Sequence, residues 1–145
     1  MKFLKSFKYA IEGFLHCVKR ERNFRVHLVA TVAVVALAVY FDLATYEILA
    51  LAFAIALVLI CEMINTAIER TIDAIRECEK ISEKTGSKGL NEGSGNIPVA
   101  GSADSIDLLR KNAKDVAAGA VFISSIFAVI VGVVIFLPHI LEVIQ

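Results

Sequence analysis

The chain has 145 residues, 57% of them apolar, and its 15 basic and 15 acidic residues give a formal net charge of zero. A mean hydropathy of +0.70 excludes an ordinary soluble domain of this size. The basic residues are confined to residues 2–25 and 70–114. Because basic segments stay on the cytoplasmic side, this distribution indicates a membrane protein with several spans and both basic blocks in the cytoplasm. No nucleic-acid partner is expected.

Residues 1–25 are predicted to form an amphipathic surface helix. Its apolar side chains recur every three or four residues, at Phe3, Phe7, Ile11, Phe14 and Val18. Lysines and arginines supply much of the other face. A helix of this kind lies in the membrane interface, with its apolar side among the acyl chains and its basic side chains at anionic headgroups.

Three apolar segments, residues 26–44, 46–64 and 116–137, are each long enough to cross a bilayer core of about 30 Å. The helix of the second span is expected to continue into the cytoplasm to about Lys84, and the third span is expected to end at Pro138 near the external surface. The N-terminus is then cytoplasmic and the C-terminus external. The predicted fold class is an all-α, multi-pass integral membrane protein with one surface helix and three transmembrane helices in a single domain.

Residues 85–105 are rich in glycine and serine, a composition that cannot build a packed core. We predict a flexible cytoplasmic loop inserted between the second and third spans. Its Gly-Ser-Lys fragment lacks the spacing of a phosphate-binding loop and follows no strand. The helix is expected to restart near Asp104.

A polar stripe follows the second span. At about 100° per residue, its members share one arc of roughly 100° on a helix; they are Glu62, Asn65, Thr66, Glu69 and Asp73. Ionisable groups at a membrane boundary usually face a bundle interior or a functional cavity. Acids three or four residues apart repel one another unless a cation lies between them. The stripe therefore calls for a metal, a proton or a basic partner.

Two other segments reach the same depth in the membrane. Glu21 ends the surface helix, and Lys114 and Asp115 precede the third span. By spacing alone, a structural network of interfacial ion pairs explains these residues about as well as a functional site does. Carboxylates that bind a divalent cation, together with a lysine, are also the groups that position a nucleotide triphosphate.

Two motifs resemble a known family. They are Glu62-x-x-Asn65-Thr66-Ala67-Ile68-Glu69-x-x-x-Asp73 and Ala113-Lys114-Asp115-x-Ala117-Ala118-Gly119-Ala120-Val121. Both are similar to the small bacterial membrane lipid kinases, the prokaryotic diacylglycerol kinase and undecaprenol kinase family. The segments Glu21-Arg22-Asn23-Phe24-Arg25-x-His27 and Ile135-Phe136-Leu137-Pro138 look most like the undecaprenol kinase branch. The resemblance implies a homotrimeric helical bundle with active sites shared between neighbouring subunits.

The resemblance also implies a role for each matching residue. Glu62 is the expected catalytic base, and Glu21 and Glu69 are expected to hold Mg²⁺. The expected nucleotide-binding residues are Tyr9, Glu21, Asn65, Glu69, Lys114 and Asp115. The expected substrate-binding residues are Asn23, Phe24, Arg25 and Glu62. Asp115 would orient Lys114 or a nucleotide group. The long connector between Ala74 and Asn112 departs from the family's short one, so no adenine contact is carried over from it.

The predicted function is transfer of the γ-phosphate of ATP to the primary hydroxyl of undecaprenol, giving undecaprenyl phosphate. The enzyme would lie in the bacterial inner membrane with its active site at the cytoplasmic face. A diacylglycerol kinase that forms phosphatidic acid is the alternative. A small transporter is a more distant alternative, although the acids lie at the cytoplasmic edge rather than in mid-membrane. A structural membrane subunit with interfacial ion pairs is the remaining alternative.

Overall fold

The structure is a computed structural model that describes residues 2–86 and 103–145. These residues form four helices, α1 (Lys2–Arg20), α2 (Arg22–Tyr40), α3 (Thr45–Gly86) and α4 (Ala103–Ile144). The described part of the chain contains no strand. Three of the helices, α2, α3 and α4, are long and apolar enough to cross a membrane. The predicted all-α membrane fold with three spans is therefore confirmed.

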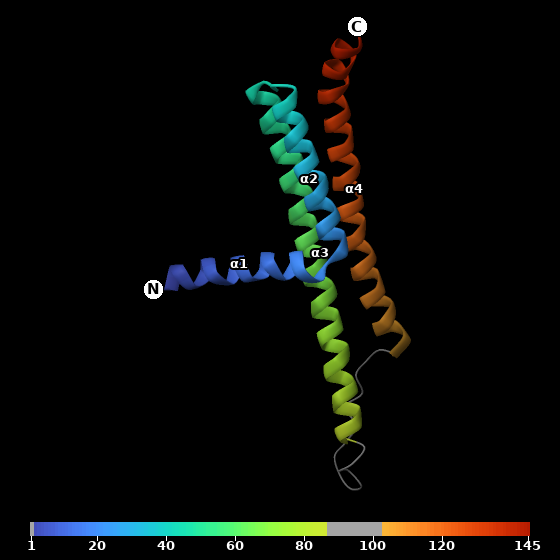
Figure 1. The fold of residues 1–145 in the computed structure, drawn as a ribbon. Coiled ribbons are helices and arrows are strands. Elements are labelled where there is room, and N and C mark those ends of the chain that lie inside the picture. Colours follow the sequence, from blue (N-terminus) through green and yellow to red (C-terminus); the bar gives the residue numbers. More distant parts are fainter. Residues whose placement is uncertain (1, 87–102) are drawn as a thin grey trace.

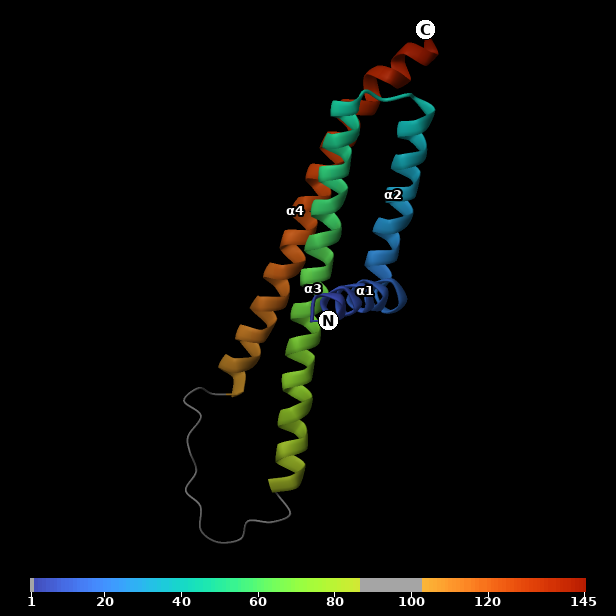
Figure 2. The same cartoon turned by 90° about the vertical axis from the view of Figure 1, so that its left-hand side faces the viewer.

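The helices α2, α3 and α4 lie side by side, and α1 projects crosswise from the bundle (Figures 1 and 2). Below the level of α1 in Figure 1, only α3 and α4 continue. The most extensive packing within the chain is between α3 and α4. The chain therefore has a three-helix part on one side of α1 and a two-helix part on the other.

A sharp corner joins α1 to α2. Glu21 adopts an extended backbone conformation, with φ −100° and ψ 119°, which ends the first helix at Arg20. Phe24 is fully buried and packs edge-on against Phe14, with ring centroids 5.4 Å apart. The predicted surface helix of residues 1–25 is thus shorter in the structure, because its last residues form the first turn of α2.

A tight turn joins α2 to α3 at the other end of the bundle. Asp42 has a positive φ of 49°, and Oε2 of Glu47 accepts a hydrogen bond from the backbone N–H of Ala44 at 2.9 Å. This bond satisfies one of the free N–H groups at the start of α3. An apolar cluster beside the turn joins α3 to α4; it consists of Leu43, Leu51, Ile135 and Phe136.

The two long helices extend well beyond one membrane thickness. Each contains 42 residues, which at 1.5 Å per residue is about 63 Å, against about 30 Å for the bilayer core. The charged ends of α3 and α4 near the loop are joined by ion pairs of Arg76 with Asp107 and of Arg110 with Glu79. This helical hairpin therefore suits water rather than lipid.

The helix that carries the third predicted span continues beyond the end of that span. Pro138 lies inside α4, which continues to Ile144. A proline removes one backbone hydrogen bond and so can bend a helix without ending it. In Figure 2 the last turns of α4 change direction relative to the rest of the helix.

The predicted flexible loop of residues 85–105 falls largely on residues 87–102, which lie outside the described residues. The two ends of that segment are helical, because α3 continues to Gly86 and α4 begins at Ala103.

Candidate functional site

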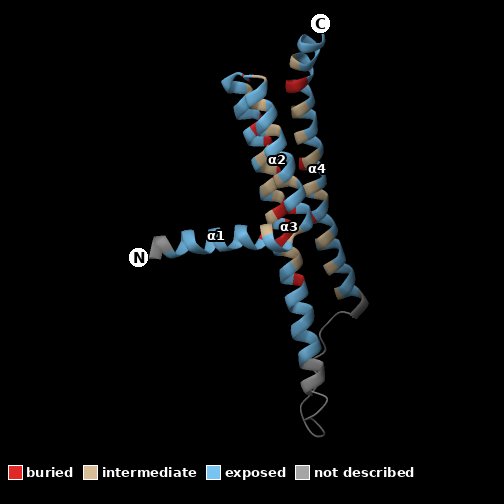
Figure 3. Ribbon diagram, viewed as in Figure 1, coloured by how far each residue is buried: buried red, intermediate tan, exposed pale blue. Residues whose placement is uncertain are grey.

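The polar stripe of α3 is buried where α1 crosses the bundle. Glu62, Asn65 and Thr66 are 3%, 8% and 6% exposed, although their neighbours at Ile64 and Ala67 are open to the outside. Buried residues, red in Figure 3, occur on α3 at this level. Burying a carboxylate and an amide is costly unless they find partners. Keeping these polar groups buried therefore lowers the stability of the fold at this place.

The α1–α2 corner packs directly on this stripe. Cys17 of α1 is 5% exposed, and its thiol forms a hydrogen bond with Thr66. Burial raises the pKa of the Cys17 thiol, and the Thr66 bond partly offsets this effect. Cys17 is therefore a protonated packing residue that fixes the corner against α3.

Three polar contacts follow Glu62 along the stripe. Nη2 of Arg70 lies 2.8 Å from Oε1 of Glu21, and Nδ2 of Asn65 donates to Oε1 of Glu69 at 3.1 Å. Nζ of Lys114 donates to Oδ1 of Asp73 at 2.6 Å. Oδ1 of Asn65 is buried and has no partner among the residues that the structure describes.

The structure brings half of the ten predicted site residues into one region. Glu62 lies close enough to His27, Glu69 and Glu21 to interact with them electrostatically. Lys114 of α4 joins the site through Asp73, one helical turn beyond Glu69. The α1–α2 corner, α3 and α4 thus each contribute a charged residue to one region.

Four of the predicted contacts are placed differently. Tyr9 is 66% exposed on the projecting part of α1 (Figure 1), and Asp115, Asn23 and Arg25 are also exposed. In this single chain, none of these side chains is enclosed by the site. They remain predicted contacts of ligands that approach from outside.

Phe24 is a correction. With 0% of its side chain exposed, it has no surface for a substrate. Its ring instead packs α1 against α2 at the corner that carries Glu21. Phe24 was expected to contact substrate only through the family resemblance, which does not distinguish a packing ring from an exposed one.

Sequence reasoning missed two contacts of the site. Arg70 pairs with Glu21, and the partner of Lys114 is Asp73 rather than the neighbouring Asp115. Asp73 was part of the stripe but received no role. The available signal was charge: a stripe of acids needs cations, and Arg70 is the basic residue on the same helix turn.

The donor set suits a hard divalent cation. Glu21 and Glu69 offer carboxylate oxygens, and Asn65 offers a buried amide oxygen without a partner. Mg²⁺ binds oxygen ligands and typically takes one or two carboxylates together with substrate phosphates. Among residues 2–86 and 103–145, no group of three His, Cys, Asp or Glu side chains is placed to hold a metal ion by itself. The residues therefore fit a cation that arrives with a phosphate ligand.

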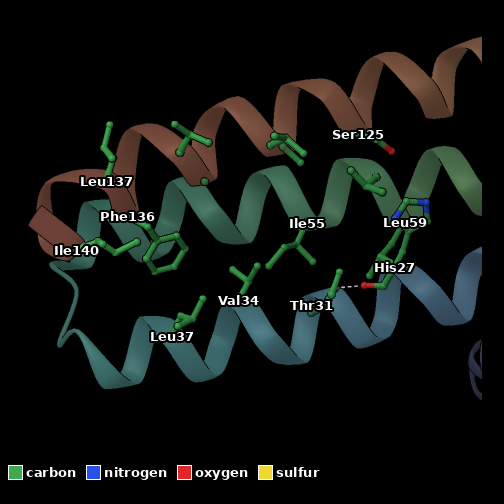
Figure 4. Close-up of a pocket in the computed structure, with 16 residues that line it drawn as sticks. His27, Thr31, Val34, Leu37, Ile55, Leu59, Ser125, Phe136, Leu137 and Ile140 are labelled. Carbon is green, nitrogen blue, oxygen red and sulfur yellow. Dashed lines mark hydrogen bonds between the residues drawn. The ribbon is translucent and has the colours of Figure 1, made fainter.

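An apolar cavity of about 510 Å³ lies between α2, α3 and α4. His27 lies at one end and Leu37, Phe136 and Ile140 at the other (Figure 4). The hydroxyl of Thr31 donates to the backbone carbonyl of His27 at 2.8 Å, so it adds no free polar group to the wall. Since His27 interacts with Glu62, the polar end of this cavity is the end nearest the site.

Comparison with known proteins agrees with this arrangement. The sequence model of the family "Prokaryotic diacylglycerol kinase" matches residues 8–87 and 102–136. A diacylglycerol kinase of Synechocystis is 34% identical over 139 residues, which cover 96% of this chain and 65% of that protein. The undecaprenol kinase of Bacillus subtilis is 31% identical over 137 residues, covering 94% of this chain and 89% of that protein.

The chain spans slightly less than two thirds of the Synechocystis protein but most of the Bacillus subtilis protein. The family model covers both halves of the site, from the surface helix through the α3 stripe to the α4 lysine. The chain therefore belongs to the prokaryotic diacylglycerol kinase family of ATP-dependent lipid kinases.

Proposed function

We propose that this chain transfers the γ-phosphoryl group of ATP to the primary hydroxyl of undecaprenol, giving undecaprenyl phosphate. The observation that carries the proposal is the placement of Glu62. This carboxylate is 3% exposed, lies near Glu21 and Glu69, and interacts with His27 at the end of a long apolar cavity. A lipid whose chain occupies the cavity would present its hydroxyl to that carboxylate.

Glu62 is the proposed general base. It accepts the proton of the lipid hydroxyl while the oxygen attacks the γ-phosphorus, and the bond from that phosphorus to the bridging oxygen breaks to release ADP. Its burial removes competing water from the reacting oxygen. His27 provides a positive or hydrogen-bonding neighbour on the cavity side, which orients the carboxylate toward the acceptor.

Glu21 and Glu69 are the proposed ligands of Mg²⁺, which when bound neutralises charge on the β- and γ-phosphates. Asn65 holds Glu69 through its amide N–H and keeps its oxygen for the cation or a phosphate-bound group. Lys114 stabilises negative charge on the transferred group, and Asp73 holds the lysine in position. Tyr9 and Asp115 are proposed to contact the nucleotide from the exposed side.

The lipid approaches from the bilayer. Asn23 and Arg25 follow the corner directly and are exposed at the membrane boundary, where a lipid headgroup or hydroxyl would pass. The cavity wall is almost entirely apolar, which suits a hydrocarbon chain and does not distinguish one chain from another. Diacylglycerol is the second candidate acceptor, because one relative is named a diacylglycerol kinase.

We further propose that the chain forms a homotrimer through α3. One face of this helix carries a strict alternation of three- and four-residue spacings, at Phe53, Leu57, Ile60, Ile64, Ala67, Thr71, Ala74, Cys78 and Ile81. We call this face the heptad seam. Phe53, Ile60 and Ile81 are 66%, 53% and 56% exposed in the single chain. A 3.5-residue repeat is typical of helices that pack on copies of themselves.

We propose that the site lies on the cytoplasmic side of the inner membrane, where ATP is available. The confinement of the basic residues to residues 2–25 and 70–114 supports this orientation. In this orientation, the hairpin of α3 and α4 projects into the cytoplasm. The apolar cluster around Phe136 then lies toward the outer surface.

The test is phosphate transfer from labelled ATP with Mg²⁺ in detergent micelles, with undecaprenol and diacylglycerol offered in parallel. We expect faster transfer to undecaprenol. Preferential transfer to diacylglycerol would keep the kinase and replace the acceptor. No transfer to either lipid by folded protein would contradict the proposal and favour the carrier or structural alternatives.

A further inference from the structure

Arg70 contacts Glu21, which is one of the two proposed ligands of Mg²⁺. Its Nη2 lies 2.8 Å from Oε1 of Glu21, and 49 positions separate the two residues. Arg70 also follows Glu69 directly on α3. It therefore borders both carboxylates that are proposed to hold the cation.

The Glu21 side chain is available for this contact because it does not cap α2. Glu21 occupies the N-cap position, yet its carboxylate makes no capping hydrogen bond. It turns instead to the guanidinium of α3. The position of the Glu21 carboxylate is therefore set by its tertiary contact with Arg70 and not by the N-terminus of α2.

A guanidinium and a divalent cation compete for one carboxylate, because both are attracted by the same negative charge. The Arg70 side chain is 54% exposed and that of Glu21 is 23% exposed. An ion pair open to water on one side is held weakly and can be exchanged. The planar guanidinium also matches the geometry of phosphate oxygens.

We propose that Arg70 exchanges partners when nucleotide binds. Its guanidinium gives up Glu21 to the cation that accompanies ATP and donates hydrogen bonds to the triphosphate. This inference rests on the proposed function, since the triphosphate is that of ATP. Arg70 then joins Lys114 as a second basic residue at the phosphates, from α3 rather than α4.

A purely structural role makes a different prediction. If Arg70 only fastens the α1–α2 corner to α3, its loss lowers stability and leaves the affinities for metal and nucleotide alone. Partner exchange predicts two affinity changes of opposite sign. Loss of the competing cation strengthens metal binding, and loss of the phosphate donor weakens nucleotide binding.

The test compares the unmodified protein with Arg70→Gln and Arg76→Gln in detergent micelles. Arg76 is the matched control, because it forms an ion pair from α3 to α4 with Asp107 rather than with Glu21 or Glu69. Calorimetric titration first measures Mn²⁺ binding without nucleotide. A second titration measures binding of a non-hydrolysable ATP analogue with Mg²⁺ present.

For Arg70→Gln we expect Mn²⁺ affinity about two- to fivefold higher and analogue affinity about tenfold lower. Arg76→Gln is expected to match the unmodified protein in both titrations. Unchanged affinities in Arg70→Gln, or a fall in both, would overturn the proposal. Arg70→Lys keeps the positive charge and loses the planar guanidinium. Its Mn²⁺ affinity should therefore equal that of the unmodified protein, and its analogue affinity should lie between those of Arg70→Gln and the unmodified protein.

The two proposals fail in distinguishable ways. If the unmodified protein binds no analogue, the proposed kinase function fails. If the unmodified protein binds the analogue, and Arg70→Gln binds Mn²⁺ and the analogue with the same affinities as the unmodified protein, the proposed kinase function is retained and partner exchange is wrong. If Arg70→Gln does not fold, an analogue affinity of Arg70→Lys equal to that of the unmodified protein would also overturn the exchange.

Discussion

The two ends of the three-helix part are built by different chemistry. At the α2–α3 turn, apolar side chains such as Leu51 and Phe136 join α3 to α4. At the crossing of α1, the buried residues of the same helix include Glu62, Asn65 and Thr66. Burial of apolar side chains lowers the free energy of the folded state, whereas burial of polar groups raises it unless those groups are hydrogen-bonded. This difference supports our proposal that the second end performs the chemistry, while the apolar first end holds the bundle together.

Glu62→Gln gives the largest expected effect. The amide keeps the shape of the carboxylate and cannot accept the proton, so we expect phosphate transfer to fall by about a hundredfold or more. Initial rates with labelled ATP measure this change. The variant should keep its thermal stability and bind the ATP analogue; substantial turnover in such a protein would rule out Glu62 as the base.

Phe136→Ala tests the other end. Phe136 is 8% exposed in the apolar cluster, and we expect a loss of about 3 to 5 kcal/mol in the free energy of unfolding. Unfolding by a denaturing detergent in mixed micelles measures it. Phe122→Ala on the same helix, at a ring that is 67% exposed, is the control and should cost less.

Phe136 also lines the apolar cavity, so folded Phe136→Ala protein should bind the lipid more weakly while its transfer at saturating lipid stays near that of the unmodified protein. A loss of transfer as large as that of Glu62→Gln would show that the two ends are not separate in function.

Asp73→Asn is expected to have a smaller effect. It removes the charge that holds Lys114 at 2.6 Å, so the lysine samples more positions. We expect kcat/KM for ATP to fall about threefold, the scale of an exposed ion pair. Asp107→Asn, which removes an acid paired with Arg76 outside the site, is the control. Equal falls in both variants would point to a loss of hairpin stability instead.

Cys78 offers the smallest perturbation, a test of the heptad seam. Its free, exposed thiol lies on that seam, whereas the free thiol of Cys17 is buried against α3. If copies of α3 pack in parallel, mild oxidation should link two chains through Cys78. Non-reducing gels measure the linked species. Cys78→Ser should abolish it and Cys17→Ser should not; linkage that persists in Cys78→Ser would contradict the seam.

Hydropathy and charge were enough to predict the three membrane-spanning helices. Period and composition also located the polar stripe, because residues three and four apart on a helix share a face whatever the helix packs against. The burial of Glu62 and Asn65 agrees with the expectation that polar groups at a membrane boundary face the interior of a bundle. The resemblance of the two motifs led to the family, which the comparisons confirm. Trimer formation and the role of each site residue stay predictions.

Other features depended on tertiary structure. The pairs of Glu21 with Arg70 and of Asp73 with Lys114 join residues 49 and 41 positions apart. The burial of Phe24 depends on the direction in which the chain turns at Glu21. Helical period and hydropathy are local properties and can be read along the chain. Partners across a corner or between two helices are fixed only when packing sets the rotation and height of one helix against another.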